Sequence, residues 1–161
     1  MSTRTQQGEV IATDMERAMD ELLQLCRDCT DREWQTSTAE EGWPIGTVAH
    51  HVGVGGRYII EMVRRVARGG AAGESMDGYH ALNASHAEQA YGREETLAFL
   101  EQVRREAGLF IRSMTDQELG TVGWSVGRRV QRTAGEQAQN LSSHAQSHIE
   151  SIRSTQALSK T

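Results

Sequence analysis

Two histidines one helical turn apart are the residues of this sequence whose spacing best suits metal chemistry. His144 and His148 lie at positions i and i+4 of a segment with helical apolar spacing, so about 40° and one turn separate them. Imidazoles at that spacing can converge on one metal ion. Both share an apolar stripe with Leu141 and Ala145, so both are predicted to point inward. They are either a metal-binding pair or core or interface histidines hydrogen-bonded to polar neighbours.

A further histidine on another predicted helix strengthens the metal hypothesis. Adjacent helical residues point about 100° apart, so only one of His50 and His51 can join a given face. His51 shares the apolar stripe of its segment with Gly55, whereas His50 lies off that stripe. Inward imidazoles at His51 and the later pair would make three protein ligands, the number typical of a catalytic zinc-like site with an open position. The glycines Gly53, Gly55 and Gly56 either permit close helix packing or leave room beside a metal for a ligand.

The composition indicates that helices position these histidines. The chain has 161 residues, one Pro and 5% aromatic residues, which favours helices over a β-sandwich or barrel. Its length suits a single domain over residues 1–161. A net charge of -5 gives no electrostatic reason to expect nucleic acid or an anionic membrane as a partner. The longest run of hydrophobic residues, 97–100, cannot span a bilayer, so the cytoplasm is the expected location.

Long amphipathic segments and one short segment form the predicted fold. Their apolar residues recur at i, i+3 and i+4, as in a helix packed on one face. Thr133 and Glu136 predict a capping box at the start of the last helix. Together they predict an all-α, up-down four-helix bundle with one additional short helix. The long helices are expected at about Val10–Cys29, from Pro44 to a glycine-rich loop at 69–78, at Arg93–Met114 and at Thr133–Ser154, and the short one at Tyr79–Ala90.

The two cysteines, Cys26 and Cys29, form a lone C-x-x-C motif. A thioredoxin-like redox pair needs that motif at the start of a helix that follows a strand. Here the motif lies near the end of an apolar helical pattern, and there is no second C-x-x-C pair to make a zinc site. We therefore interpret both cysteines as packing residues.

The order of the motifs resembles the DinB-like four-helix metalloproteins. In that family a Trp precedes the second helix, a His follows eight residues later, and H-x-x-x-H lies on the last helix. His51 follows Trp43 at that spacing, and the similarity extends over about residues 10–153. The resemblance implies one divalent metal ion per protomer, zinc or nickel, held by His51, His144 and His148 with water in the open positions. It is carried by GWPI at 42–45, AHHV at 49–52, ALNA at 81–84 and HAQSHIESIR at 144–153.

The resemblance also implies a class of reaction. Characterised relatives include transferases and isomerases in which a metal activates a low-molecular-weight thiol such as bacillithiol or mycothiol. A metal lowers the pKa of a bound thiol or water. The implied function is a metal-dependent thiol S-transferase, or a related hydrolase or isomerase, acting on a small electrophile. The alternative is a non-catalytic protein that binds metal or a small ligand in a stress response.

The resemblance further implies a homodimer, because bundles of this kind often pair through helix faces. Leu23 and Phe99 lie off the main apolar stripes and could supply part of that interface.

Three further residues are candidates for substrate binding. Asn83 matches a position that recurs in the family, where a buried amide could orient a ligand or form a helix–helix hydrogen bond. Tyr58 lies seven residues after His51 on the same face, so it either approaches the pocket or packs in the core. Trp124 borders a glycine-rich loop and could line the pocket mouth.

The remaining charged and imidazole groups are predicted to lie on the surface. Arg128, Arg129 and Arg132 either form a solvated basic face or attract a carboxylate-bearing cosubstrate. His80 and His86 are predicted surface residues. No residue is assigned a catalytic role from the sequence.

Overall fold

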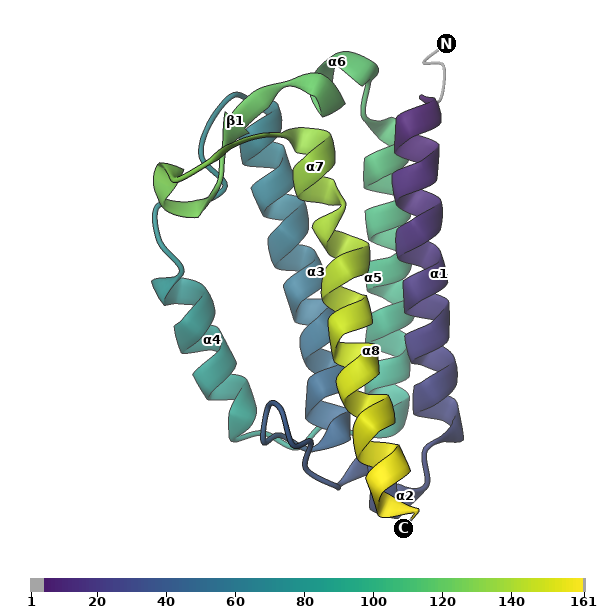
Figure 1. Ribbon diagram of the computed structural model, residues 1–161. Coiled ribbons are helices and arrows are strands. Elements are labelled where there is room, and N and C mark those ends of the chain that lie inside the picture. The colour runs from purple at the N-terminus through teal and green to yellow at the C-terminus, as the bar shows by residue number, and fades with distance from the viewer. Residues whose placement is uncertain (1–4, 161) are drawn as a thin grey trace.

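Four long helices pack side by side in a computed structural model that describes residues 5–160 (Figure 1). The predicted all-α four-helix bundle is confirmed. The long helices are α1 (Gln6–Asp28), α3 (Ile45–Ala67), α5 (Arg93–Ser113) and α8 (Asn140–Ser159). The shorter elements are α2 (Asp31–Trp34), α4 (Asp77–Ala87), α6 (Asp116–Gly120), β1 (Val122–Trp124), the 3-10 helix η1 (Val126–Arg128), β2 (Gln131–Thr133) and α7 (Ala134–Ala138).

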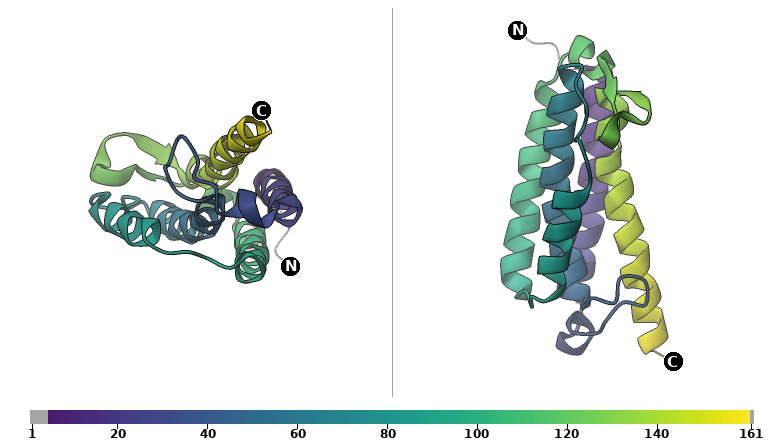
Figure 2. Two further views of the ribbon diagram at one scale, coloured as in Figure 1. Left: turned by 90° about the horizontal axis from the view of Figure 1, so that it is seen from below. Right: turned by 90° about the vertical axis from the view of Figure 1, so that its left-hand side faces the viewer.

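The order of the helices around the bundle is α1, α5, α3, α8, so α1 and α3 face each other across the diagonal. In Figure 1, α1 and α8 run downward while α3 and α5 run upward. In the chain, the short helix α4 follows α3 and precedes α5, and it runs downward in Figure 1. The helices α1, α3, α4, α5 and α8 therefore alternate in direction along the chain. Because this downward run takes place outside the bundle, α4 lies beside α3 as an outer wall (Figure 2).

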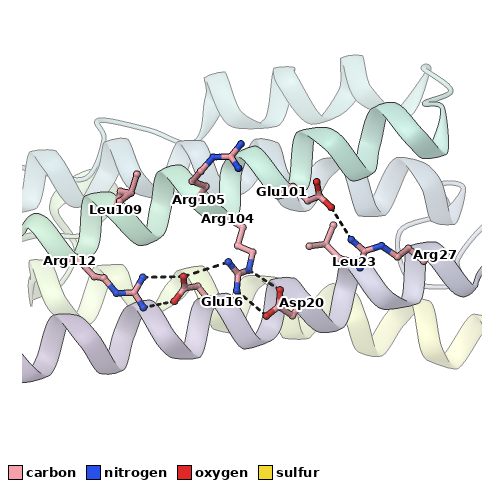
Figure 3. A pocket seen from close by; sticks show the side chains of 9 residues that line it. All are labelled: Glu16, Asp20, Leu23, Arg27, Glu101, Arg104, Arg105, Leu109 and Arg112. Carbon is pink, nitrogen blue, oxygen red and sulfur yellow. Dashed lines mark hydrogen bonds and ion pairs between the residues drawn. The ribbon is translucent and has the colours of Figure 1, made fainter.

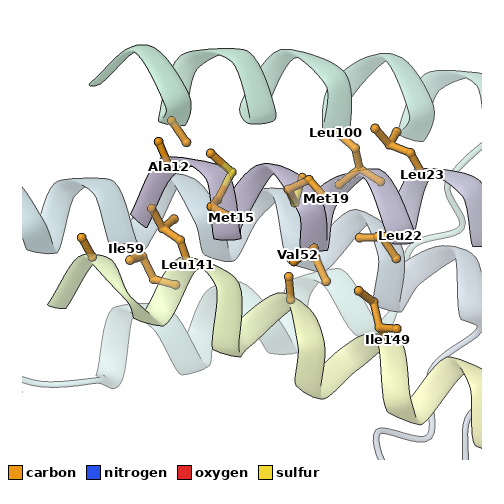
Figure 4. Packing of buried hydrophobic residues seen from close by; sticks show 14 of the residues in the cluster. Ala12, Met15, Met19, Leu22, Leu23, Val52, Ile59, Leu100, Leu141 and Ile149 are labelled. Atoms are coloured by element: carbon orange, nitrogen blue, oxygen red, sulfur yellow. The ribbon is translucent and has the colours of Figure 1, made fainter. Parts of the chain in front are cut away.

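Apolar side chains from the long helices fill the centre of the bundle (Figure 4). Met15 and Leu22 of α1 meet Leu100 of α5 and Ile149 of α8, and each of these side chains is fully buried. Burying one such side chain stabilises the fold by roughly 1.5–3 kcal/mol. The bundle is therefore held together by ordinary hydrophobic packing.

The observed helix ends refine the predicted ones. The first helix begins at Gln6, because the Thr5 hydroxyl accepts a hydrogen bond from the Gly8 amide and caps it. The capping box of Thr133 and Glu136 is confirmed. The predicted last helix is divided at Gln139 into α7 and α8.

A small hairpin lies between α6 and α7. Its strands β1 and β2 pair antiparallel, with Trp124 opposite Gln131. The backbone of Trp124 also accepts a hydrogen bond from the amide of Ala72 and donates one to the carbonyl of Gly70. These bonds fix the hairpin to the loop after α3, at the upper end of α4 (Figure 1).

Ion pairs join α1 to α5 along a groove on their outer side (Figure 3). Nε of Arg104 lies 2.8 Å from Oδ1 of Asp20, and Nη1 of Arg112 donates a hydrogen bond of 3.0 Å to Oε2 of Glu16. These half-buried arginines therefore have carboxylate partners on the facing helix.

Two surface predictions, those for Leu23 and His86, are wrong. Leu23 belongs to the core and is 3% exposed, so it is not available to a dimer interface. Phe99 is half-buried and stacks on His50, with 4.6 Å between ring centroids. His86 is 8% exposed, because the end of α4 packs its ring near Tyr91 and His50. His80 is exposed, as predicted.

Both cysteines are buried free thiols, which confirms that they are packing residues. Burial raises the pKa of Cys26 to about 12, so its thiol stays protonated at neutral pH. Within residues 5–160, no helix combines the length and the apolar character that crossing a membrane requires.

Candidate metal centre

Three histidines from two helices meet in the space between α3 and α8. One ring nitrogen from each of His51, His144 and His148 lies within 4.8 Å of the other two. The ring centroids are 5.2 Å apart for His51 and His144, and 4.9 Å apart for His51 and His148. His51 is 3% exposed, and the two histidines of α8 are half-buried. The fold therefore brings together the three histidines that the apolar stripes predicted to point inward.

Gly55 makes the close approach of α3 and α8 possible. A Cβ atom at this position would lie 2.3 Å from Cε1 of His144. Since real Cβ atoms do not approach other atoms so closely, a larger residue would displace the His144 ring. Gly53, two residues earlier, receives the Phe99 ring from α5 in the same way. Gly53 and Gly55 therefore both allow close packing, Gly53 of the Phe99 ring and Gly55 of the His144 ring, as the first alternative predicted.

A carboxylate fixes the orientation of His148. Its Nδ1–H donates a hydrogen bond of 2.8 Å to Oε1 of Glu41, and hydroxyls of Ser151 and Thr38 donate to Oε2 at 2.6 Å each. Burial tends to raise the pKa of Glu41, but these hydrogen bonds outweigh it and lower the pKa to about 2. The ionised carboxylate leaves Nε2 of His148 as the acceptor nitrogen, the arrangement found where a carboxylate supports a metal-bound histidine.

Tyr79 of α4 covers the histidines from outside the bundle. Its hydroxyl lies 3.2 Å from Nε2 of His51 and 3.5 Å from Nε2 of His144. Burial raises the pKa of Tyr79, so the phenol keeps its proton at neutral pH and can donate it in a hydrogen bond. The short helix therefore contributes a polar group directly to the site.

Burial lowers the pKa of two of the three imidazoles, those of His51 and His144. Burial, with the neighbouring His144 and His148, lowers the pKa of His51 to about 3. Burial, with His148, lowers the pKa of His144 to about 4. Nδ1 of His51 is buried without a hydrogen-bond partner among residues 5–160. His51 and His144 are therefore neutral near pH 7, the form of imidazole that binds a divalent cation, and a bound cation would compensate their burial.

His50 takes no part in this cluster. Its ring stacks on Tyr91 with 3.7 Å between centroids, and its Nδ1 lies 3.4 Å from the hydroxyl of Thr96. It therefore faces α5, away from the space between α3 and α8.

A cavity of about 520 Å³ opens beside the histidines, between α3, α4, the hairpin and α8. Tyr58 lines it and packs against Tyr79, with ring centroids 5.2 Å apart. Trp124 holds the hairpin in place, while its neighbours Ser125 and Val126 line the cavity. The cavity wall is formed by Gly55, Tyr58, Ile59, Met62, Met76, Tyr79, Ser125, Val126, Arg132, Gln137, Asn140, Ser143, His144 and Ser147.

Asn83 lies one turn after Tyr79 on α4 and is half-buried. Its Oδ1 is buried with no hydrogen-bond partner in the part of the chain that the structure describes. Oδ1 of Asn83 is therefore available to accept a hydrogen bond, either from a bound ligand or from a neighbouring helix.

The sequence did not single out Glu41 or Tyr79. Glu41 lies in the irregular connection before α3, where no period predicts which way a side chain points. Tyr79 lies on the short polar helix α4, which has no regular apolar stripe to predict which of its side chains point toward the bundle.

The fold and the histidine cluster define a helical bundle with a candidate three-histidine metal centre. The model of the DinB superfamily matches residues 14–152, so the chain belongs to that superfamily, as its motifs predicted. No curated protein matches the chain.

Among solved structures, the chain is similar to YfiT from Bacillus subtilis. The TM-score is 0.79 at 16% sequence identity, over 99% of this chain and 92% of that one. YfiT is described as "a probable metal-dependent hydrolase with an unusual four-helix bundle topology". At this identity the likeness shows that the two proteins share a fold.

Proposed function

We propose that the protein is a metal-dependent enzyme that activates a thiol or water for attack on a small electrophile. One observation carries the proposal: the imidazole nitrogens of His51, His144 and His148 converge within 4.8 Å beside a cavity of about 520 Å³. In this proposal the three imidazoles hold one divalent ion per protomer, zinc or nickel. Three neutral ligands leave the ion dipositive, which favours a bound anion.

When bound, the metal supplies a Lewis acid that lowers the pKa of the coordinated thiol or water. Glu41 holds His148 in the tautomer and orientation that a ligand needs. Tyr79 presents a hydroxyl that can donate a hydrogen bond to a group held at the site. Met62 and Ile59 line the cavity and make it a suitable place for the apolar part of an electrophile.

Two nucleophiles are compatible with this arrangement. The family resemblance supports a thiol and an S-transferase reaction. The description of YfiT as a probable hydrolase supports water. A non-catalytic protein would need the ion but would not need an approach for a second reactant, and the cavity beside His144 favours the enzyme.

A cobalt-substituted sample separates these possibilities. We expect small thiols to produce thiolate-to-cobalt absorption bands in the wild type, and no such bands in His148→Ala. Thiol bands would support the transferase, whereas a cobalt spectrum that responds to pH and not to thiol would support the hydrolase. Failure of cobalt to bind at all would contradict the enzyme proposal.

The compartment and the oligomeric state belong to the same proposal. We propose the cytoplasm because both cysteines are free thiols, which suits a reducing compartment. A homodimer is proposed from the family resemblance, and sedimentation that gives only a monomer of 17.8 kDa would contradict it.

A further inference from the structure

Arg132 of β2 differs from the other half-buried arginines of this protein. Residues 5–160 contain four of them, and Arg93, Arg104 and Arg112 each pair with a carboxylate. Nη2 of Arg93, for example, lies 3.0 Å from Oδ1 of Asp31. Arg132 forms no such ion pair within the described residues.

The environment of Arg132 holds its guanidinium in place without neutralising it. Nη1 donates a hydrogen bond of 3.0 Å to Oε1 of Gln137, whose side chain is 3% exposed. The amide of Gln137 is anchored in turn by a contact of 3.6 Å with the sulfur of Met62. Nε of Arg132 is buried and has no hydrogen-bond partner among residues 5–160. A half-buried positive charge without a counter-charge is unfavourable, so a ligand that supplied one would be bound preferentially.

Arg132 lies on the wall of the cavity that reaches His144 and Tyr79. Neither aspartate nor glutamate is among the residues that line this cavity. Ile59 and Met62 contribute to the apolar part of the cavity wall. The cavity thus combines one guanidinium without a counter-charge, apolar walls, and one of the candidate metal ligands, His144.

We propose that Arg132 binds the carboxylate of a substrate whose apolar body lies along Ile59 and Met62 and whose reactive group faces His144. This inference rests on the proposed function and names its substrate class, a small monocarboxylic acid. A carboxylate suits the site because guanidinium binds it through paired, charge-assisted hydrogen bonds. Apart from the proposed ion, Arg132 is the one charged side chain among the residues that line this partly apolar cavity, so it matches one carboxylate at that end of a substrate.

The hairpin provides matched controls. Arg128 and Arg129 precede Arg132 by three or four residues, and both are exposed to solvent. They contribute the same charge to the same hairpin but do not line the cavity. Neutralising either one tests whether a general basic surface is enough to attract the ligand.

The test is calorimetric binding of straight-chain carboxylates, from butanoate to octanoate, to the zinc-loaded protein, with the amide of equal length as the uncharged partner. We expect the wild type to bind the best carboxylate about tenfold more tightly than its amide, the size of effect that a hydrogen bond to a charged group provides. Arg132→Gln should lose this preference, whereas Arg132→Lys should keep part of it and Arg129→Gln all of it. The melting temperature of each variant shows whether its fold is intact.

Three results would overturn the proposal: equal binding of carboxylate and amide, no binding by any member of the series, or an undiminished preference in Arg132→Gln. The last result would place the carboxylate on the metal or elsewhere. Metal content, measured on the same samples, separates this inference from the proposed function. A protein that retains no zinc after loading, but prefers carboxylate to amide and loses this preference in Arg132→Gln, contradicts the proposed function and supports the carboxylate site. A protein that retains zinc but shows no preference contradicts the carboxylate site and leaves the metal centre supported.

Discussion

At the scale of single residues, the neighbouring imidazoles of His50 and His51 have different surroundings. His51 faces two histidines of α8, whereas His50 is stacked between aromatic rings on the side of α5. The helical rotation between adjacent positions produces this difference.

The first prediction uses that difference. We expect His148→Ala to lose the bound divalent ion, because two imidazoles remain where three are needed. His50→Ala should keep about one ion per protomer, because its ring does not face the site. Metal content by mass spectrometry after dialysis measures both. Equal loss from the two variants would mean that the three-histidine assignment is wrong.

Glu41 acts on the site through another residue, since its carboxylate contacts His148 and not the open side of the cluster. The second prediction is that Glu41→Gln lowers metal affinity about 10- to 100-fold, the range for a lost carboxylate partner of a metal-bound histidine. Competition with a chromophoric chelator measures the affinity. Glu40→Gln, an exposed neighbour, is the control and should have no effect. An affinity that is unchanged in Glu41→Gln would show that His148 needs no orienting group.

The histidines of the site could be predicted from the sequence because each lies on a long helix with a regular apolar stripe. Glu41 could not, because its position depends on how the connection before α3 folds against the middle of α8. Arg132 shows the same limit. The sequence grouped it with Arg128 and Arg129, and only the pairing of β1 with β2 separates its half-buried side chain from their exposed ones.

At the scale of elements, α4 is the part of the fold most directly concerned with access to the site. It lies outside the bundle, forms a wall of the cavity, and carries the tyrosine that contacts the histidines (Figure 2). A helix in this position depends on a few side chains for its attachment.

The third prediction is that Tyr79→Phe loosens α4 in metal-free protein. A typical intramolecular hydrogen bond contributes about 0.5–1.5 kcal/mol, so amide hydrogen exchange across residues 77–87 should become roughly 2- to 10-fold faster. Exchange in α3 should not change. Tyr91→Phe, which removes a hydroxyl bonded only to exposed Gln89, is the matched control. Unchanged exchange in α4 would show that other contacts hold this helix.

The long helices and the short helix α4 were predicted from the sequence, whereas the hairpin and the other short helices were not, for a physical reason. A helix of about twenty residues repeats its apolar stripe several times, so its period is readable. The hairpin has no comparable pattern and owes its position to backbone bonds with the loop after α3. The division between α7 and α8 at Gln139 likewise has no local sequence signal, since neither Gly nor Pro stands at positions 138–140.

At the scale of the whole molecule, the buried histidines link stability to pH. In the folded protein the pKa of His51 is about 3 and that of His144 about 4, against about 6.5 for an unperturbed histidine. Between those values the unfolded chain binds more protons than the folded one. Stability must therefore fall as the pH falls through this window.

The fourth prediction is that chelator-treated protein melts at progressively lower temperature from about pH 7 to pH 5, whereas zinc-loaded protein resists until protons compete for the ligands. Binding to the native state alone adds about 4 kcal/mol when free metal is a thousand times the dissociation constant. The apolar core should keep the metal-free protein folded near neutral pH. Melting by circular dichroism, with and without chelator, measures both curves. Identical curves at every pH would show that no metal stabilises this fold.

The placement of the ligands along the chain has a consequence for the order of events in the cell. His51 is made early, but its partners on α8 lie 93 and 97 residues later. During translation, the first imidazole of the site therefore exists long before the other two. A single imidazole binds a metal ion only weakly. In the proposed site, all three imidazoles can hold an ion only once α8 has docked against α3. An ion bound there would therefore be selected by the folded site and not by an unfolded peptide.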